Sequence, residues 1–318
     1  MKIIAIQGNK LEQLNLQSDT SLFIASQMIK YEYRIFWYEP HHMSYSNNQL
    51  IAYGCYITVQ FCEKSKQPLT YVIDSFATLD LFSASCIIVR QDPPVNIEYL
   101  HSLNMLSLLK NKMFIFNDLF ALRTEVEKLL PIRIASNATP YTIISNDFHQ
   151  IKEFLKQHQT IVLKPIYGYG GQEVIKATTK IEIENYLKKF ENMQIIAQEF
   201  LPQIYDGDKR IIVYEGKILG VIGRNPEKGN FITNTCAGGQ LYRTKLSNNE
   251  KTICEGIALK LQEKNIFFAG IDMIGDYVTE INITSPTLLV GLAILEGMNC
   301  IKPLFNTIDQ KIKSFIHC

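Results

Sequence analysis

The chain has 318 residues, of which 47% are hydrophobic and 20% charged, a composition typical of a globular protein of roughly two domains. Its 32 Lys and Arg residues against 31 Asp and Glu residues give a net charge of +1, which argues against phosphate-neutralising nucleic-acid binding and against a polybasic membrane surface. No stretch approaches the about 18 apolar residues of a membrane span, and the seven scattered cysteines include no C-x-x-C pair, so we expect a cytoplasmic protein with reduced thiols.

The first part of the chain alternates between predicted strands and helices. Strands are expected at 1–7, 33–38, 86–91 and 113–117, and helices at about 20–30, 96–110 and 118–130. Short β segments over 43–75, around Asn47-Asn48, indicate an inserted hairpin. Because strands that alternate with helices usually lie parallel, this region predicts a mostly parallel sheet covered on both faces.

A different pattern begins after Pro131. Helices are expected at 147–158, 180–191, 249–264 and 303–317, and strands at 160–166, 173–177, 194–201, 210–214 and 217–223, with two further β segments after residue 265. The turn at Glu215-Gly216 makes the strands on either side of it antiparallel neighbours. The whole chain is therefore expected to be an α/β protein with closely joined lobes.

A lysine near the end of a predicted strand is followed by a glycine-rich loop. Lys164 precedes Gly168, Gly170 and Gly171. Glycines allow backbone N–H groups to converge on a phosphate, and a lysine adds a positive charge. The loop therefore indicates a phosphate site, although a plain hairpin with an exposed lysine has a similar sequence.

Three oxygen-bearing side chains mark a second candidate site. Glu280 and Asn282 alternate along one predicted strand and so share a face, and Asp272 lies on the strand before it. Carboxylate and amide oxygens suit Mg²⁺ better than zinc or iron. The alternative is a solvated polar face of an antiparallel sheet.

The hairpin between these two strands decides whether the three side chains can meet. A two-residue loop at Gly275-Asp276 would place Asp272 opposite Thr279, whereas a three-residue loop with a bulge would pair residue 274 with 278 and set Asp272 opposite Glu280. We predict the second register, since a shared cation needs both carboxylates on one face.

Arginines at strand ends and a long loop complete the set of candidate residues. Arg210 follows Asp208 at the start of one strand, Arg224 ends the next strand, and Arg90 ends a strand in the first region. Such arginines can hold phosphates or carboxylates in bidentate fashion, although each could equally be a surface ion-pair partner. The glycine-rich stretch 223–239 is typical of a mobile lid or a binding loop.

Taken together, these segments resemble the bacterial glutathione synthetases of the ATP-grasp superfamily. The shared motifs are VRQDPP at 89–94, LKP at 163–165, GYGG at 168–171, QEFLP at 198–202, GDKR at 207–210, RNP at 224–226, AGG at 237–239, GIDMIG at 270–275 and TEINITSPT at 279–287. The resemblance implies an N-terminal domain over 1–122 and an ATP-grasp domain over 123–318, whose two α+β lobes, 123–202 and 203–318, clasp the nucleotide.

The resemblance also implies an activity and a role for each motif. The expected reaction joins γ-glutamylcysteine to glycine, with ATP as co-substrate and Mg²⁺ or Mn²⁺ as cofactor, through an acyl phosphate, in an enzyme that is commonly a homo-oligomer. The residues expected to bind ATP are Lys128, Lys164, Gly168, Gly170, Gly171, Glu199, Phe200, Leu201 and Asp208. The metal ligands are expected to be Asp272, Glu280 and Asn282. Substrate contacts are expected from Arg90, Arg210, Arg224, Gly238 and Gly239, with Arg210 and Arg224 acting in catalysis.

The chain departs from the family pattern mainly on the substrate side. The lid has Ile232 where the family often has arginine, and Val290 and Gly291 stand where a polar pair is common. Two alternatives therefore stay open: another ATP-grasp ligase that joins an amine to a different carboxylate, and a nucleotide-binding module without catalysis. A complete set of Asp272, Glu280, Asn282, Lys164 and Arg210 argues against the second alternative.

Overall fold

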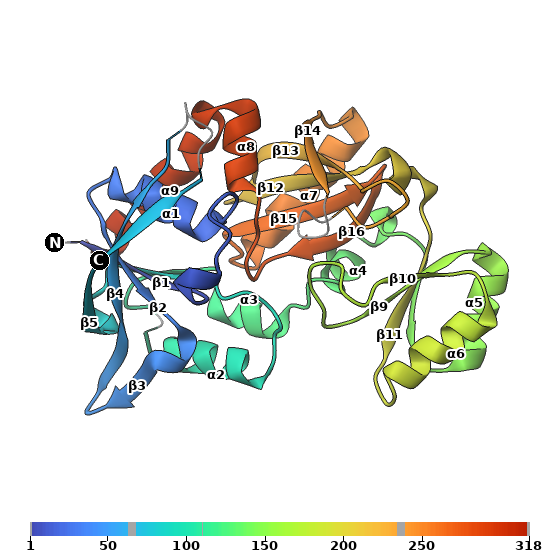
Figure 1. The fold of residues 1–318 in the computed structure, drawn as a ribbon, viewed down its shortest axis with the longest axis horizontal. Helices are drawn as coiled ribbons and strands as arrows, with labels where there is room; N and C mark the ends of the chain where they lie inside the picture. Colours follow the sequence, from blue (N-terminus) through green and yellow to red (C-terminus); the bar gives the residue numbers. More distant parts are fainter. Residues whose placement is uncertain (1, 63–67, 110, 234–238, 317–318) are drawn as a thin grey trace.

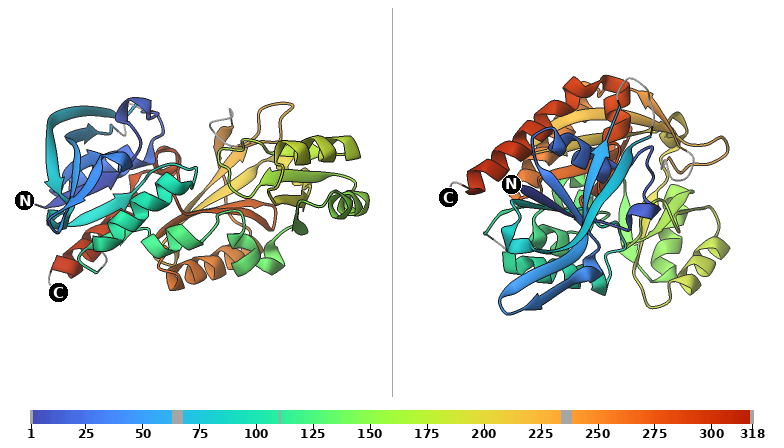
Figure 2. Two further views of the ribbon diagram at one scale, coloured as in Figure 1. Left: turned by 90° about the horizontal axis from the view of Figure 1, so that it is seen from below. Right: turned by 60° about the vertical axis from the view of Figure 1, so that its left-hand side comes forward.

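The computed structural model describes residues 2–62, 68–109, 111–233 and 239–316. Within these residues the strands form sheets of seven, four and five strands, each built from a different stretch of the chain (Figure 1). The seven-stranded sheet is N-terminal and the four-stranded sheet belongs to a small lobe. The five-stranded sheet lies between them in space (Figures 1 and 2).

The seven-stranded sheet combines a parallel core with an antiparallel extension. The parallel strands are β1 (Ile3–Gln7), β2 (Arg34–Tyr38), β6 (Cys86–Val89) and β7 (Phe114–Phe116). The antiparallel strands are β3 (Met43–Ser46), β4 (Gln49–Gln60) and β5 (Thr70–Asp80). The predicted parallel core and inserted hairpin are confirmed, but the insertion extends to residue 80, because β5 pairs with β4 along its length.

Four helices follow in this part of the chain. Helices α1 (Thr20–Ile29), α2 (Ile97–Leu106) and α3 (Leu119–Thr124) lie beside this sheet, whereas α4 (Leu130–Ile134) packs against β16 (Tyr277–Asn282) of the five-stranded sheet (Figure 1). The single helix predicted over 118–130 is wrong: the helix that Asp118 caps ends at Thr124, and residues 125–129 form a turn before α4. The carbonyl of Glu127 accepts a hydrogen bond from Ile281 N (3.1 Å), which holds this turn against another part of the chain. Lys128 is therefore on a turn and not on a helix.

The small lobe has a sheet and a core of its own. Its strands are β8 (Thr142–Ser145), β9 (Ile161–Pro165), β10 (Ile175–Ala177) and β11 (Ile195–Glu199), in the order β10-β9-β11-β8, with all neighbours antiparallel. Helices α5 (Phe148–His158) and α6 (Lys180–Lys189) pack on the sheet through Ile151 and Ile183. Strand β8 was not predicted, since four residues with half-exposed side chains give little periodicity.

The five-stranded sheet is antiparallel throughout and has the order β14-β13-β12-β15-β16. Its strands are β12 (Asp208–Tyr214), β13 (Lys217–Asn225), β14 (Gln240–Arg243), β15 (Phe268–Ile274) and β16 (Tyr277–Asn282). Helix α7 (Asn248–Glu263) packs Cys254 and Ile257 into the same core as Ile211 and Ile271, on one face of this sheet. The opposite face carries polar groups beside apolar residues such as Ile212 and Ile222, which belong to a second hydrophobic core.

The last two helices join the N-terminal region to the five-stranded sheet. Helices α8 (Leu289–Glu296) and α9 (Met298–Ile316) share one hydrophobic core with α1, β1 and β13. Helix α8 was not predicted, and α9 begins at Met298, before the predicted start at 303, so Pro303 lies inside the helix, where it supplies no backbone N–H. The small lobe takes no part in this shared core.

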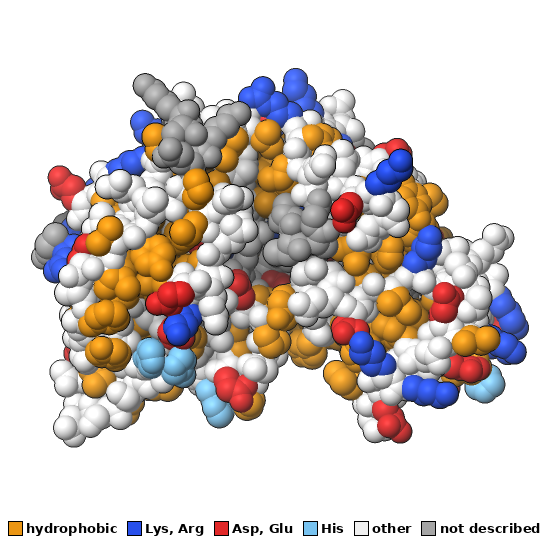
Figure 3. Space-filling model, in the orientation of Figure 1, with side chains coloured by type: hydrophobic (Ala, Val, Ile, Leu, Met, Phe, Trp, Pro, Cys, Tyr) orange, Lys and Arg blue, Asp and Glu red, His pale blue; other side chains and the backbone are white. Residues whose placement is uncertain are grey.

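The surface mixes charges of both signs. On the face in Figure 3, basic side chains lie singly or in small groups among acidic ones, and a hollow opens near the centre. Among the helices of the described residues, none has the length and apolar character that crossing a membrane requires.

Candidate active site

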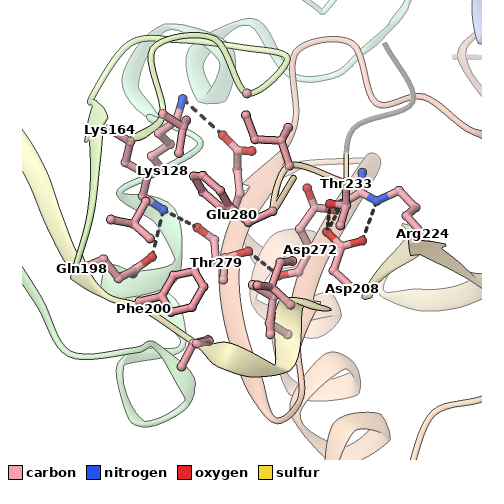
Figure 4. Close-up of a pocket in the computed structure, with 18 of the residues that line it drawn as sticks. Lys128, Lys164, Gln198, Phe200, Asp208, Arg224, Thr233, Asp272, Thr279 and Glu280 are labelled. Carbon is pink, nitrogen blue, oxygen red and sulfur yellow. Dashed lines mark hydrogen bonds and ion pairs between the residues drawn. The ribbon is translucent and has the colours of Figure 1, made fainter. Parts of the chain in front are cut away.

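A cavity of about 870 Å³, its open mouth included, separates the small lobe from the polar face of the five-stranded sheet (Figure 4). The predicted site residues that line it are Lys128, Lys164, Gly170, Gly171, Glu199, Phe200, Leu201, Asp208, Arg224, Asp272 and Glu280. Arg90, Arg210, Gly168, Gly239 and Asn282 are not among its lining residues, and Gly238 lies outside the described residues.

Strand alternation explains the polar face of the sheet. Asp208 and Arg210 are two residues apart on β12 and so share a face; Asp208 pairs with Arg224 of β13, and Arg210 pairs with Asp272 of β15. Asp272 in turn pairs with Glu280 of β16. The sheet thus presents one continuous row of charged side chains across four strands.

The hairpin pairs Asp272 with Glu280 as predicted, but its turn differs from the predicted one. Residues 274 and 277 pair around a two-residue turn in which Gly275 has φ +55°, so the predicted pairing of 274 with 278 is wrong. The bulge lies inside β16, where Thr279 is the extra residue, and it restores the match of Asp272 with Glu280. The predicted pairing of Asp272 with Glu280 is therefore confirmed.

Arginines neutralise the sheet side of the cavity. Arg210 binds Asp272 through Nε and through Nη2 (2.9 Å to Oδ2), and Arg224 binds Asp208 through Nε (2.8 Å) and Nη2 (2.5 Å). Arg224 Nη2 also lies 3.1 Å from Asp272 Oδ1. Burial alone would raise the pKa of Asp272, but the two guanidinium groups lower it to about 2. Asp272 is therefore ionised at any physiological pH.

The lysines on the opposite wall make no bidentate ion pairs, and of the two only Lys128 lies within ion-pair distance of a carboxylate. Lys164 Nζ donates to Gln198 Oε1 (3.0 Å) and to the carbonyl of Thr279 (3.2 Å), which are uncharged acceptors. Burial lowers the pKa of Lys164 to about 8. Lys128 Nζ donates to the carbonyl of Gly168 and lies 3.4 Å from Glu280 Oε1 (Figure 4). Two ammonium groups against one carboxylate leave this wall positive, as an anion site requires.

The three predicted metal ligands lie at one end of the charged row. Asn282 Nδ2 donates to Asp272 Oδ2 (3.2 Å), and Glu280 lies beside both on the same face. Two carboxylates and an amide are hard donors that fit Mg²⁺ or Mn²⁺. The amide would have to turn its oxygen toward a cation, because here its nitrogen faces Asp272.

The end of β11 forms another edge of the cavity. Glu199 N donates to the carbonyl of Tyr141 (2.9 Å), and its carboxylate accepts from Tyr141 N (3.2 Å). Phe200 packs its ring against Phe231 of the loop after β13, with 6.1 Å between ring centroids. Apolar rings at this edge and charges at the other suit a ligand with an aromatic base and a phosphate chain.

Comparison with known proteins identifies the family. A model of the prokaryotic glutathione synthetase N-terminal domain matches residues 1–123, and a model of the prokaryotic glutathione synthetase ATP-grasp domain matches residues 127–297. The glutathione synthetase of Agrobacterium fabrum is 32% identical over 316 residues, which are 98% of this chain and 97% of that protein. The chain belongs to the prokaryotic glutathione synthetase family.

Solved structures agree on the ATP-grasp fold of this glutathione synthetase family member. The D-cycloserine synthetase DcsG superposes with a TM-score of 0.65 at 11% identity, covering 96% of this chain and 99% of that one. The D-alanyl-alanine synthetase A of Vibrio cholerae gives 0.63 at 13% identity, covering 100% and 99%. At these identities the likeness concerns the fold and not the substrates.

Arg90, expected on the substrate side of a glutathione synthetase, lies apart from the cavity. Its buried guanidinium donates to Ser21 Oγ (3.0 Å) and to the carbonyl of Pro286 (2.9 Å). Burial lowers the pKa of Arg90, and in the described structure no carboxylate lies within ion-pair distance of it. The contact with Pro286 links the VRQDPP motif to the end of the TEINITSPT motif.

The family departures fall into two groups. Val290 is buried in α8, and a Cβ on Gly291 would lie 2.8 Å from Leu241 Cδ1, so this apolar segment packs against the sheet and does not face the cavity. Ile232 does line the cavity, beside Thr233, whose hydroxyl donates to Asp208 Oδ2 (2.7 Å). The apolar lid residue is therefore the departure that a ligand would meet.

Sequence reasoning missed three residues of the glutathione synthetase site. Gln198 and Thr233 hold Lys164 and Asp208, and the carbonyl of Thr279 accepts from Lys164. Gln198 could have been found as the polar residue in an otherwise apolar strand. The Thr279 carbonyl could not, because any residue at a bulge supplies one.

Proposed function

We propose that the chain is a glutathione synthase, which ligates γ-glutamylcysteine to glycine with ATP and yields glutathione, ADP and phosphate. A carboxylate is a poor electrophile, so ATP must first convert the cysteinyl carboxylate to an acyl phosphate, which the glycine amine then attacks. Such phosphoryl transfer asks a protein mainly for positioning and charge neutralisation. The observation that carries the proposal is the cavity in which two lysines face a row of carboxylates and arginines, in a chain of this family.

The nucleotide would lie with its phosphates at the two lysines and its base at the end of β11. Lys128 and Lys164 hold the phosphates, the loop with Gly168, Gly170 and Gly171 covers them, and Glu199, Phe200 and Leu201 receive the base at the apolar edge. Asp208 acts on this side through Arg224, to which it is bound. Support comes from the separation of apolar and charged lining residues along the cavity.

Asp272, Glu280 and Asn282 would hold Mg²⁺ or Mn²⁺. A bound divalent cation would neutralise charge on the transferred phosphate. Arg210 and Arg224 would stabilise the acyl phosphate, but both are bound to carboxylates here. Release of a guanidinium from Asp272 would leave that carboxylate to the cation and the arginine to the substrate.

The peptide substrate would lie beside this centre, between the N-terminal region and the lid. We assign to it Arg90, Arg210, Arg224 and the glycines 238 and 239. The N-terminal domain would end at 122 and the two ATP-grasp lobes would cover 123–202 and 203–318. The near-neutral net charge supports a protein that binds neither nucleic acid nor membranes. A cytoplasmic location and a homo-oligomeric state belong to the proposal through the family resemblance.

The decisive experiment measures ADP release by the purified protein with ATP and Mg²⁺. Release should require γ-glutamylcysteine and glycine together, and mass spectrometry should find glutathione in equal amount. Product formed with a different carboxylate or amine, and not with these two, would favour another ATP-grasp ligase. Nucleotide binding without release under any condition would favour a non-catalytic module.

A further inference from the structure

The turn between α3 and α4 is bound to the outer edge of β16 through one residue. Glu127 accepts four hydrogen bonds there: its carbonyl from Ile281 N (3.1 Å), and Oε1 from Ile283 N (2.6 Å), Thr284 N (2.9 Å) and Thr284 Oγ1 (2.9 Å). Strand β16 is the last strand of its sheet, and β15 occupies its other edge. Glu127 thus bonds to backbone groups at the edge of β16 that no other strand occupies.

The residues that follow these contacts belong to the active site. Lys128 comes directly after Glu127 in the chain, and Glu280 and Asn282 flank Ile281 on β16. Lys128 Nζ lies 3.4 Å from Glu280 Oε1. The bonds of Glu127 therefore tie the backbone that carries a phosphate lysine to the backbone that carries two metal ligands.

We propose that Glu127 is a positioning residue of the ligase: it fixes Lys128 relative to Glu280 and Asn282, and does not itself contact nucleotide or substrate. The inference rests on the proposed function. It adds to that function a residue that keeps the phosphate-binding Lys128 at the right distance from the metal ligands Glu280 and Asn282. No feature of the sequence motifs assigns such a role to Glu127.

A carboxylate suits this position for a physical reason. Three donors converge on the single oxygen Oε1, and hydrogen bonds to a charged acceptor are stronger than those to a neutral one. Removing the side chain would leave Ile283 N and Thr284 N unpaired at the end of β16, which carries a larger penalty than the loss of the bonds themselves. The end of the strand with Asn282 would then loosen.

The test compares Glu127→Ala with a matched control, Glu250→Ala. Glu250 is also buried and accepts from backbone N–H, at Ser247 (2.6 Å), and from Lys209, but it caps α7 outside the cavity. Both variants should lower the melting temperature. Only Glu127→Ala should weaken the binding of ADP with Mg²⁺, by about tenfold in calorimetry, the effect of roughly one lost charge-assisted bond.

Two further measurements separate positioning from stability alone. Glu127→Gln keeps an Oε1 acceptor and should recover most of the ADP affinity, and in Glu127→Ala the KM for ATP should rise while the KM for the peptide stays unchanged. Hydrogen exchange at the amides of Ile281 and Ile283 should be faster in nucleotide-free Glu127→Ala and unchanged in Glu250→Ala. ADP affinity equal to wild type in a folded Glu127→Ala protein would overturn the inference.

If Glu127→Ala does not fold, Glu127→Asp is measured instead. Aspartate keeps the charge, but its side chain is one methylene shorter, so its oxygens lie farther from Ile283 N and Thr284 N. Wild-type ADP affinity and wild-type exchange in that variant would contradict the role. Failure of the proposed function is distinguishable, because wild-type protein would then make no glutathione while the ADP-binding comparison between variants could still be made.

Discussion

The two walls of the cavity handle charge in opposite ways. On the sheet side, Arg210 and Arg224 are bound to Asp208 and Asp272 in short bidentate pairs, so this wall is close to neutral. On the lobe side, Lys164 faces only uncharged acceptors. A buried ammonium without a counterion is costly, whereas paired ions compensate one another. The side with Lys164, the unpaired wall, can therefore receive an anion without breaking an ion pair. On the side with Arg210 and Arg224, the paired wall, an arginine must leave its carboxylate before it can bind a ligand.

The largest effect should come from breaking the paired wall. Asp272→Asn removes the carboxylate that two arginines share, and leaves their charges less compensated in a buried site. We expect kcat to fall by at least about a hundredfold and the free energy of unfolding to drop by about 3 kcal/mol. Steady-state kinetics and denaturant unfolding measure the two effects.

A control separates the two consequences of that change. Asp309 is another buried carboxylate, bonded to Lys313 (2.6 Å) and Tyr33 (3.0 Å) away from the cavity. Asp309→Asn should reduce stability and leave kcat as in the wild type. If Asp272→Asn were as active as Asp309→Asn, Asp272 would have no part in the phosphate site.

The unpaired wall should respond in the opposite sense. Lys164→Met removes a desolvated ammonium whose burial outweighs the attraction of Glu280 and Asp272, so stability should stay equal or rise. The affinity for ATP should fall by about tenfold or more, because a charged contact with phosphate is lost. Isothermal calorimetry with an ATP analogue and thermal unfolding test both statements. A large loss of stability would show that the unpaired wall is held together by ion pairs after all.

The pKa of Lys164 sharpens the contrast further. Because burial lowers this pKa to about 8 from the usual 10.5, the nucleotide-free protein loses the ammonium charge as pH rises through 8. ATP affinity should therefore decline above pH 8. Between pH 8 and 10.5 the unfolded chain holds more protons than the folded one at this group, so its contribution to stability increases with pH. In Lys164→Met both trends should be weaker, and an unchanged pH profile would exclude Lys164 as their source.

The contrast between the walls was only partly predictable from sequence. Period-2 alternation correctly grouped Glu280 with Asn282, and the need for a shared cation led to the pairing of Asp272 with Glu280. The partners of the arginines were not predictable, because the pairing of β12 with β15 joins strands separated by α7. The turn at Lys128 was predicted as helix, since the bonds of Glu127 to β16 involve residues more than 150 positions away.

The same limit applies to the fold. Long segments with clear periodicity, such as α5, β9 and β12, appear as predicted. The four-residue strands β8 and β14 were missed, because each is held by a neighbouring strand and not by its own pattern. Helix α8 is apolar on nearly all sides, since it is buried between α1 and β13, and such a helix has no amphipathic signal.

The smallest expected effect concerns the hydroxyl that joins the lid to the paired wall. Thr233 Oγ1 donates to Asp208 Oδ2 (2.7 Å), and Asp208 already carries the bidentate bond of Arg224. Thr233→Val keeps the shape but removes one donor, which is worth about 1 kcal/mol and roughly a fivefold rise in the KM for ATP if the lid closes over the nucleotide. Ser at this position keeps the hydroxyl and should restore the KM. A wild-type KM in Thr233→Val together with a raised KM in Thr233→Ser would mean that the methyl group, packed beside Ile232, matters more than the bond to Asp208, and that the lid contacts this wall through apolar surface alone.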